Sequence, residues 1–183
     1  MSLWVVRHGK PLVAPGTCYG MLDLEAEPEA TQIAATALAH AVPHNAVVLS
    51  SPLKRCLQLA YRLVDLRPDL SFAIESRLRE MDFGNWEGVA WADIPRAAVD
   101  AWTADFAMHR FGGRESANDV LARVTEVWDA MRSAPAAEQR DVVWLTHAGV
   151  AQAVRLLEQG VRRVERSEDW PLPGLAYGAW LKF

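Results

Sequence analysis

Short apolar runs alternate with longer segments of helical periodicity along the whole chain, and this alternation constrains the fold more than any other feature. The expected strands are Leu3 to Val6, Ala46 to Leu49, Phe72 to Ile74, Val142 to Leu145 and Leu175 to Phe183. The expected helices are Ile33 to Val42, Leu53 to Val64, Ala97 to Met108, Ala117 to Met131 and Val150 to Leu157. Strands that alternate with helices indicate a mainly parallel sheet with helices on both faces. We therefore expect a three-layer α/β/α fold.

Two local signals refine this interpretation. Ser51 and Pro52 directly follow the second strand, and a serine before a proline is typical of a helix start, with Ser51 as the N-cap and Pro52 as the first helical residue. The stretch Ser133 to Ala137 contains Pro135 between two periodic segments. This pattern predicts a surface connection.

The composition is that of a soluble folded domain. A chain of 183 residues normally forms one domain, so we expect residues 1–183 to fold as a unit. Hydrophobic residues make up 51% of the chain and charged residues 23%, which argues against disorder and against a coiled coil. The formal net charge of −4 gives no positive field, so neither nucleic acid nor an anionic membrane is an expected partner.

The sequence also bears on location and cysteine chemistry. No apolar run approaches the ~18 residues of a membrane span. The N-terminal apolar run meets Arg7 and His8 too soon to be the core of a signal peptide, so we expect a cytoplasmic protein. Cys18 and Cys56 form no C-x-x-C pair and no metal-ligand cluster, which predicts two ordinary reduced thiols.

Cationic and imidazole side chains gather where three of the predicted strands end. Arg7, His8 and Gly9 follow the first strand, Arg55 lies in the first turn of the helix after the second, and His147 follows the late strand. The carboxyl ends of parallel strands meet at one edge of a sheet, where ligands bind. The sequence therefore predicts that two arginines and two histidines converge on one small volume.

This convergence predicts an anion site. A cation in a first helical turn opposes the helix dipole at a cost of roughly 0.3–1 kcal/mol, so the position of Arg55 points to a bound anion. Guanidinium groups and helix N-termini suit phosphate, and carboxylate is the weaker choice. His8 lies beside Gly9, where the backbone is least hindered, and is the expected nucleophile of a phosphohistidine mechanism.

Phosphomonoester hydrolysis also needs a proton donor for the leaving oxygen. The stretch LREMDFGNWEG, from Leu78 to Gly88, holds three acids among aromatic and glycine residues, as a pocket-lining loop would. Glu80 is the first choice for the donor. Asp82 and Glu87 stay open as alternatives.

Four motifs in this order resemble the histidine phosphatase superfamily, the phosphoglycerate-mutase-like proteins. They are VVRHG at Val5 to Gly9, SSPLKR at Ser50 to Arg55, the Leu78 to Gly88 stretch, and THAG at Thr146 to Gly149. The resemblance extends from Leu3 to about Leu157. It implies a phosphate pocket of Arg7, His8, Arg55 and His147, with His8 taking the phosphoryl group, Glu80 donating a proton, and no metal or other cofactor.

Within the superfamily, the loop GTCYG at Gly16 to Gly20, followed by Asp23, resembles α-ribazole phosphatases of cobalamin synthesis. The turn at Gly112 to Ser116 resembles their G-G-E-S turn with one inserted residue. The resemblance implies further substrate contacts from Gly9, Tyr19, Gly20 and Ala148.

Specificity is expected to come from the pocket walls. Aromatic walls around Tyr19, Trp86 and Trp91 would suit a flat base on a ribose phosphate. Lys10 and Pro11 stand where many relatives have an acidic residue and a threonine, and their role stays open.

The expected function is that of a phosphomonoesterase with a small-molecule substrate, and α-ribazole 5′-phosphate is the first candidate. A broad-specificity phosphatase is the alternative. A phosphoglycerate mutase is less favoured because the chain is short for its added segments, and a non-catalytic phospholigand binder because His8 and the acid are both present. The oligomeric state stays open between monomer and homodimer.

Overall fold

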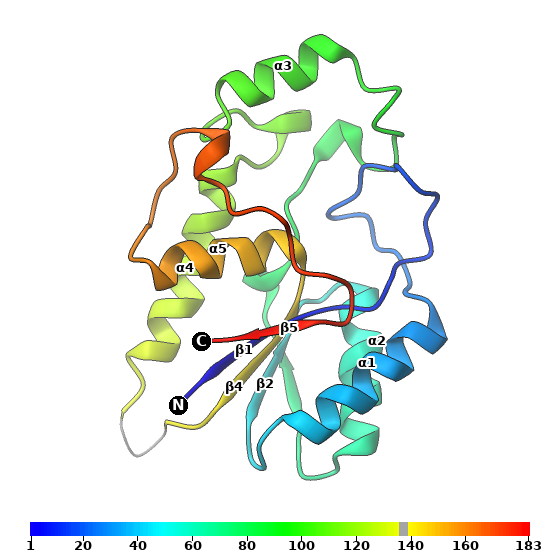
Figure 1. Ribbon diagram of the computed structural model, residues 1–183, viewed down its shortest axis with the longest axis vertical. Helices are drawn as coiled ribbons and strands as arrows, with labels where there is room; N and C mark the ends of the chain where they lie inside the picture. The colour runs from blue at the N-terminus through cyan, green and yellow to red at the C-terminus, as the bar shows by residue number, and fades with distance from the viewer. Residues whose placement is uncertain (136–138) are drawn as a thin grey trace.

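The computed structural model describes residues 1–135 and 139–183, which contain a five-stranded sheet in the order β3-β2-β4-β1-β5 (Figure 1). The strands are β1 Leu3–Arg7, β2 Val47–Ser50, β3 Phe72–Ile74, β4 Val142–Thr146 and β5 Trp180–Lys182. β1 to β4 are parallel, and β5 pairs antiparallel with β1 at the sheet edge. The prediction of a mainly parallel sheet is confirmed.

Helices cover both faces of this sheet, as predicted. α1 Pro28–Ala41 and α2 Lys54–Leu66 pack together on one face, and α4 Ala117–Arg132 and α5 Ala148–Glu158 pack together on the other (Figure 1). α3 Arg96–Ala104 lies apart from these layers, at the top of Figure 1. Within the described residues, no helix is long and apolar enough to cross a membrane.

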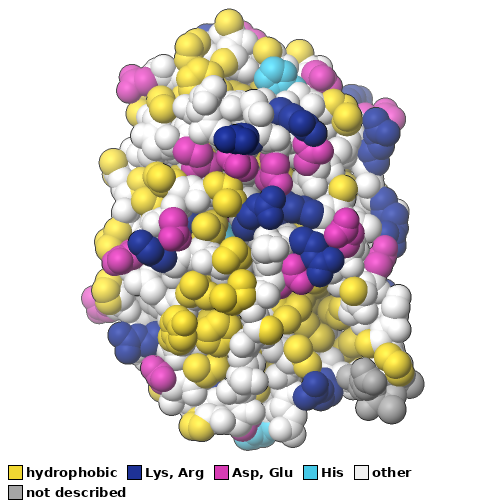
Figure 2. Space-filling model, turned by 180° about the vertical axis from the view of Figure 1, so that it is seen from behind, with side chains coloured by type: hydrophobic (Ala, Val, Ile, Leu, Met, Phe, Trp, Pro, Cys, Tyr) yellow, Lys and Arg dark blue, Asp and Glu magenta, His cyan; other side chains and the backbone are white. Residues whose placement is uncertain are grey.

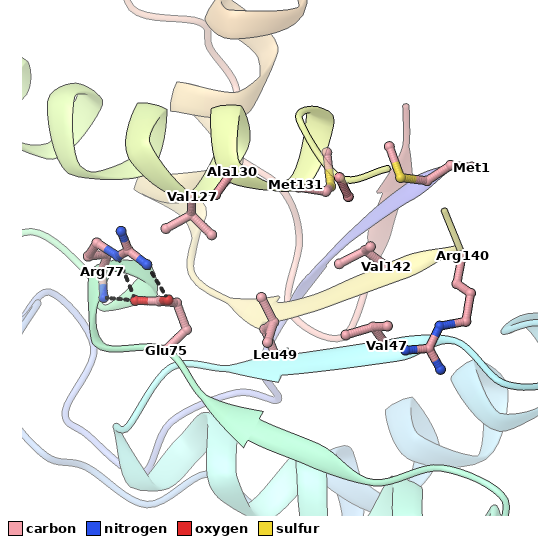
Figure 3. A pocket seen from close by; sticks show the side chains of 11 residues that line it. Met1, Val47, Leu49, Glu75, Arg77, Val127, Ala130, Met131, Arg140 and Val142 are labelled. Atoms are coloured by element: carbon pink, nitrogen blue, oxygen red, sulfur yellow. Dashed lines mark hydrogen bonds and ion pairs between the residues drawn. The ribbon is translucent and has the colours of Figure 1, made fainter. Parts of the chain in front are cut away.

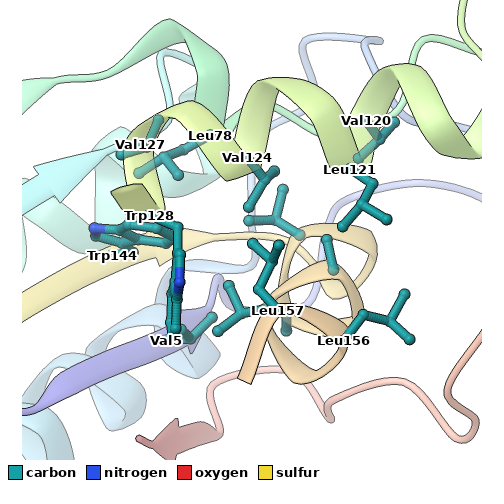
Figure 4. Close-up of a cluster of buried hydrophobic side chains, with 14 of the residues drawn as sticks. Val5, Leu78, Val120, Leu121, Val124, Val127, Trp128, Trp144, Leu156 and Leu157 are labelled. Atoms are coloured by element: carbon teal, nitrogen blue, oxygen red, sulfur yellow. The ribbon is translucent and has the colours of Figure 1, made fainter. Parts of the chain in front are cut away.

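The central strands have continuous apolar sequences because both of their faces are buried. In β1, Leu3 and Val5 pack into the core under α4 and α5, whereas Trp4 and Val6 pack under α1 and α2. Figure 4 shows the first of these cores, where Val5 and the fully buried Trp144 of β4 meet side chains of α4 and α5. The alternation along each strand therefore joins the three layers.

Between β3 and α4 the chain forms an insert, residues 76–116, which contains α3 and three short 3₁₀ helices: Ser76–Leu78, Gly84–Trp86 and Phe111–Gly113. Its own small core centres on the buried Phe111, on which Trp102 stacks at 4.5 Å between ring centroids. Gly112 has a φ of +75°, and a Cβ there would overlap the carbonyl oxygen of Phe83. A glycine is therefore required where these two turns meet.

Predicted boundaries of three helices are wrong. α1 begins at Pro28, five residues before the predicted Ile33. α2 begins at Lys54 with Leu53 as its N-cap, so Ser51 is not a capping residue and Pro52 is not helical. The hydroxyl of Ser51 is instead turned toward another side chain, described below. α3 ends at Ala104, four residues before the predicted Met108, because the next residues form turns in which the N–H groups of Met108 and His109 bond to the carbonyl of Asp105.

Three further expectations need correction. The predicted apolar stripe on α1 included Ile33, but Ile33 is 65% exposed and the helix buries Thr31, Ala34, Ala35 and Leu38. An alanine-rich helix is apolar on more than one side, so packing against α2 decides its buried face. Ala148 and Gly149 form the first turn of α5 rather than a separate turn, and β5 covers only the end of the predicted range 175–183. Of the predicted connection Ser133 to Ala137, Ala136 and Ala137 lie outside the described residues.

Candidate active site

The two histidines lie at the ends of adjacent strands. β1 and β4 pair in register up to Arg7 and Thr146, and the N–H of His8 donates to the carbonyl of Thr146 at 3.1 Å. His147 is the N-cap residue of α5. The two imidazole rings meet edge to face, with their centroids 5.1 Å apart. The parallel pairing of β1 and β4 therefore places both imidazoles in one buried site.

The hydrogen bonds of His8 fix its tautomer. Its Nδ1 lies 2.6 Å from the carbonyl oxygen of Gly9, and because a carbonyl only accepts, Nδ1 carries the proton. Nε2 is then unprotonated, and its lone pair accepts a hydrogen bond from Nε of Arg55 at 3.2 Å. Burial, and secondly the charge of Arg55, hold the pKa of His8 well below its usual value. His8 is therefore a neutral imidazole with an unprotonated Nε2.

His147 is fully buried and pairs with a residue that the sequence analysis assigned to a helix cap. Its Nε2 lies 2.8 Å from Oγ of Ser51, whereas its Nδ1 is buried without a partner among the described residues. Burial, and secondly the charge of Arg55, hold the pKa of His147 well below its usual value. The signal that could have identified Ser51 is its place directly after β2, at the same sheet edge as both histidines.

Arg55 is fully buried as the second residue of α2, and a loop holds its guanidinium in place. Nη1 donates to the carbonyl of Leu22 at 2.8 Å, and Nη2 donates to the carbonyl of Gly20. A Cβ on Gly20 would overlap the carbonyl oxygen of Met81, so the close approach of the two chain segments requires glycine. With Nε directed at His8, the guanidinium links the loop to the imidazole.

Glu87, one of the three candidate acids, holds that loop. Its carboxylate accepts the N–H groups of Gly20, Met21 and Leu22, each at 2.9 Å. It also accepts the N–H of Phe83 at 2.9 Å. Four backbone donors occupy this carboxylate, which leaves Glu87 a structural residue that orients the carbonyl groups facing Arg55.

The other two candidate acids, Asp82 and Glu80, differ in the backbone groups that they bind. Asp82 accepts the N–H of Gly84 at 2.9 Å within its own turn. Glu80 instead accepts the N–H of Gly149 at 3.1 Å, in the first turn of α5 and two residues beyond His147. A Cβ on Gly149 would overlap Oε1 of Glu80, so the glycine makes room for this carboxylate. Of the three acids, Glu80 is the one bound beside the histidines.

A buried arginine that the sequence analysis missed binds the backbone carbonyls at and before Glu80. Arg123 of α4 is 9% exposed, and its Nη1 donates to the carbonyls of Arg77 and Arg79 at 2.6 and 2.7 Å. Its Nη2 donates to the carbonyl of Glu80 at 3.1 Å, and its Nε donates to Glu115 at 2.9 Å. The backbone before Glu80 is thus tied to α4.

Arg7 and two tyrosines border the other side of the site. Nη1 of Arg7 donates to the carbonyl of Leu175 at 2.6 Å, and its guanidinium lies 3.8 Å from the ring centroid of Tyr177. The hydroxyl groups of Tyr177 and Tyr19 lie 2.6 Å apart. Two loops far apart in sequence therefore meet over the arginine, and only Tyr19 was anticipated.

The remaining predicted positions have clear places. The charge of Lys10 is paired with Glu27 at 2.8 Å, and its side chain is 61% exposed, so it is solvated at the surface. Pro11 bridges to Ala26 in the neighbouring loop. A Cβ on Gly9 would lie 2.8 Å from Oγ1 of Thr31, so this glycine allows close packing on α1.

Trp86 and Trp91 do not border the site as expected. Trp86 packs on Phe111 at 5.9 Å between centroids, and Trp91 stacks on the same ring at 5.8 Å. Trp86 belongs to the small core of the insert, whereas Trp91 covers Phe111 from outside and is 39% exposed. The aromatic wall is instead formed by Trp102, Phe106 and Trp170, which line a cavity beside Glu80.

Two of the cavities lined by described residues lie near the sheet, and the smaller of them borders the site. The larger, of about 580 Å³, opens between α4 and the β2 and β4 strands and touches none of the predicted site residues (Figure 3). The smaller, of about 340 Å³, is lined by Glu80, Ala148 and Gly149. Figure 2 shows the rear face, where hydrophobic side chains gather in the lower half and charges of both signs lie across the middle.

The thiols and the acids offer little other chemistry. Burial raises the pKa of Cys18 and of Cys56 to about 12, so both are protonated thiols. Within residues 1–135 and 139–183, no group of three His, Cys, Asp or Glu side chains is placed to hold a metal ion. The chemistry available to the site is that of two neutral imidazoles, two guanidinium groups and one carboxylate.

The comparison with known families agrees with this geometry. The family model of the histidine phosphatase superfamily (branch 1) matches residues 3–168. The chain belongs to this superfamily. It is therefore a phosphatase, a hydrolase of the phosphoglycerate-mutase-like fold.

Individual relatives extend along nearly the whole chain. A glucosyl-3-phosphoglycerate phosphatase of Mycobacterium tuberculosis is 32% identical over 97% of this chain and 82% of its own length. A putative phosphoserine phosphatase 2 of Hydrogenobacter thermophilus is 25% identical, over 87% of this chain and 79% of its own length. The structure of mycobacterial glucosyl-3-phosphoglycerate phosphatase with inorganic phosphate superposes with a TM-score of 0.80 at 25% identity, covering 99% of this chain and 88% of that chain. The superfamily predicted from the motifs is confirmed, whereas these relatives are not α-ribazole phosphatases by name.

Proposed function

We propose that this phosphatase hydrolyses small-molecule phosphomonoesters through a phosphohistidine formed on Nε2 of His8. One observation carries the proposal. The bond from Nδ1 of His8 to the carbonyl of Gly9 leaves the lone pair on Nε2, between a guanidinium and a second imidazole. A neutral, oriented imidazole among cations is the arrangement that nucleophilic attack on a phosphoryl group needs.

The other site residues stabilise the transferring group and supply the proton. The guanidinium groups of Arg7 and Arg55 and Nδ1 of His147 bind the oxygens of the transferring group and stabilise the charge that develops on it. Glu80, when protonated, gives its proton to the leaving alkoxide. The resulting carboxylate then accepts a proton from the water that attacks the phosphohistidine, which releases phosphate and restores both groups.

We propose both a general substrate class and one specific substrate. The relatives reported above carry the name glucosyl-3-phosphoglycerate phosphatase, and the GTCYG loop resembles α-ribazole phosphatases. Both names describe phosphate esters of a polyfunctional alcohol. We take α-ribazole 5′-phosphate as the first candidate, because aromatic residues line the cavity beside Glu80 and suit a flat base.

A phosphatase assay in EDTA tests the proposal. The panel contains α-ribazole 5′-phosphate, glucosyl-3-phosphoglycerate, 3-phosphoglycerate, phosphoserine and p-nitrophenyl phosphate. We expect release of phosphate without added metal, with the highest kcat/KM for α-ribazole 5′-phosphate. Equal rates on all esters would support the broad-specificity phosphatase, and tight phosphate binding without turnover on any ester would contradict the proposed reaction.

A further inference from the structure

The cavity of about 340 Å³ beside Glu80 has walls of an unusual composition. Phe83, Trp102 and Phe106 come from the insert, and Trp170 comes from the segment after α5. Phe106 lies between the two tryptophans, with centroid distances of 5.5 Å to Trp102 and 5.9 Å to Trp170. Aromatic rings from two distant segments thus line one cavity.

The polar groups of this cavity are few. Of the lining side chains in the described part of the chain, only Glu80 carries a charge. The amide nitrogen of Gln152 already donates to the carbonyl of Pro171 at 2.6 Å. Nε1 of Trp102 is buried without a partner among the described residues, and Ser167 adds a hydroxyl to the lining. A polyhydroxylated or anionic group would still leave water here for fewer partners than it loses, which is costly for each unpaired buried polar atom. An apolar ring would lose nothing and would gain contact area.

The cavity begins at the group that serves the leaving oxygen. Ala148 and Gly149, which follow His147 directly, form its floor together with Glu80, and the N–H of Gly149 holds the carboxylate. A phosphomonoester attacked by His8 would therefore place its ester oxygen near Glu80 and the body of its alcohol near the aromatic walls.

Building on the proposed function, we propose that this cavity binds the leaving alcohol and selects esters whose alcohol carries a flat aromatic ring. An apolar cavity of about 150 Å³ is enough for benzene. The larger volume here has room for a fused bicyclic ring. Trp102, Phe106 and Trp170 are the specificity-determining side chains, and the preferred substrate class is an alkyl phosphate bearing such a ring.

Three esters with the same kind of leaving oxygen test this preference: 2-(1-naphthyl)ethyl phosphate, ethyl phosphate and glycerol 3-phosphate. All three release a primary alkoxide, so the demand on Glu80 is matched and the body of the alcohol is what differs. We expect kcat/KM for the naphthyl ester to exceed that for ethyl phosphate by about tenfold or more, the scale of one well-filled apolar subsite. Glycerol 3-phosphate is expected to gain nothing over ethyl phosphate.

Variants of the cavity lining test whether these side chains cause the preference for the naphthyl ester. Phe106→Leu and Trp170→Leu are expected to reduce the ratio of naphthyl to ethyl kcat/KM about tenfold. Ser167→Phe fills the half-buried mouth of the cavity without removing core atoms, and it is expected to reduce the same ratio even if the other two variants fold poorly. Tyr61→Leu is the control, because Tyr61 is 58% exposed on α2 and does not line the cavity. This control should leave both rates unchanged.

A binding measurement separates this inference from the proposed reaction. 2-(1-Naphthyl)ethanol, the product alcohol, is expected to quench the tryptophan fluorescence of the wild type saturably and to bind Ser167→Phe at least about tenfold more weakly. Equal kcat/KM for the naphthyl and ethyl esters, or a ratio that the three cavity variants do not change, would overturn the cavity assignment while the phosphatase stands. If no ester turns over, the proposed reaction fails, and absent or variant-independent quenching would then overturn the cavity as well.

Discussion

At the scale of single residues, the site depends on how few of its polar atoms are left free. Two nitrogens of Arg55 donate hydrogen bonds to backbone carbonyls, and the third donates to His8. The Nδ1 proton of His8 is bound to the carbonyl of Gly9, so Nε2 is the atom proposed to attack phosphorus. Each of these side chains is held by the backbone in one orientation, which is the condition for preorganised catalysis.

Arg55→Lys should therefore be a severe change despite the conserved charge. An ammonium cannot bond to two carbonyls and to an imidazole in one plane, so we expect kcat to fall by about 10²–10³-fold. Arg62→Lys, exposed on the same helix, is the matched control and should retain activity. Steady-state kinetics decide the matter, and equal kcat for Arg55→Lys and the wild type would contradict the role given to this guanidinium.

Glu80→Gln tests the proton donor. We expect the variant to hydrolyse alkyl phosphates about 10²–10⁴-fold more slowly, because an alkoxide leaves poorly without a proton. p-Nitrophenyl phosphate should be affected far less, since its departing oxygen scarcely needs one. If both classes slow equally, the proton comes from another group, and Asp82→Asn is the variant to compare next.

The two buried histidines also predict how stability depends on pH. Their pKa values are lowered in the folded protein, so the unfolded chain binds more protons as pH falls through its ordinary histidine pKa of about 6.5. The free energy of unfolding should then fall below that pH by up to about 1.4 kcal/mol per pH unit for each histidine. Urea unfolding at a series of pH values should give a shallower fall for His147→Gln than for the exposed control His40→Gln, and identical slopes would contradict the assignment.

At the scale of elements, segments that are distant in sequence contact and orient the side chains at the strand ends. Glu87 of the insert binds the N–H groups of residues 20–22, the loop whose carbonyls face Arg55. The C-terminal segment brings Tyr177 onto Arg7, where it meets Tyr19. The strand ends supply the proposed catalytic groups, and the surrounding loops hold them.

Glu87→Ala should show the importance of this support. Four backbone N–H groups lose their acceptor, so we expect the free energy of unfolding to fall by about 1–3 kcal/mol, and kcat to fall for every ester alike. Glu87→Gln should recover part of both losses. Glu126→Ala, an exposed acid on α4, is the control. A loss confined to alkyl phosphates would instead identify Glu87 as the proton donor.

At the scale of the whole molecule, the sequence predicted what local pattern and parallel topology determine. Arg7, His8, Arg55 and His147 could be placed together because each follows a strand of the same sheet. Ser51 also follows a strand of this sheet, but its serine-proline pattern favoured a helix cap. Glu87, Arg123 and Tyr177 could not be placed, because their partners are more than sixty residues away or, for Arg123, more than forty. The same reason explains Trp86 and Trp91, whose pattern was aromatic but whose packing within the insert is tertiary.

The central claim is the covalent step on His8. Wild-type enzyme mixed with a phosphomonoester and quenched within one turnover at alkaline pH, where phosphohistidine survives, is digested and analysed by mass spectrometry. The account predicts a phosphoryl group on the peptide that contains His8, at a level that rises and decays with turnover, and its absence from an inactive His8→Asn variant. Rapid turnover with no phosphoryl group on His8 at any quench time, or unchanged turnover in the variant, would contradict it.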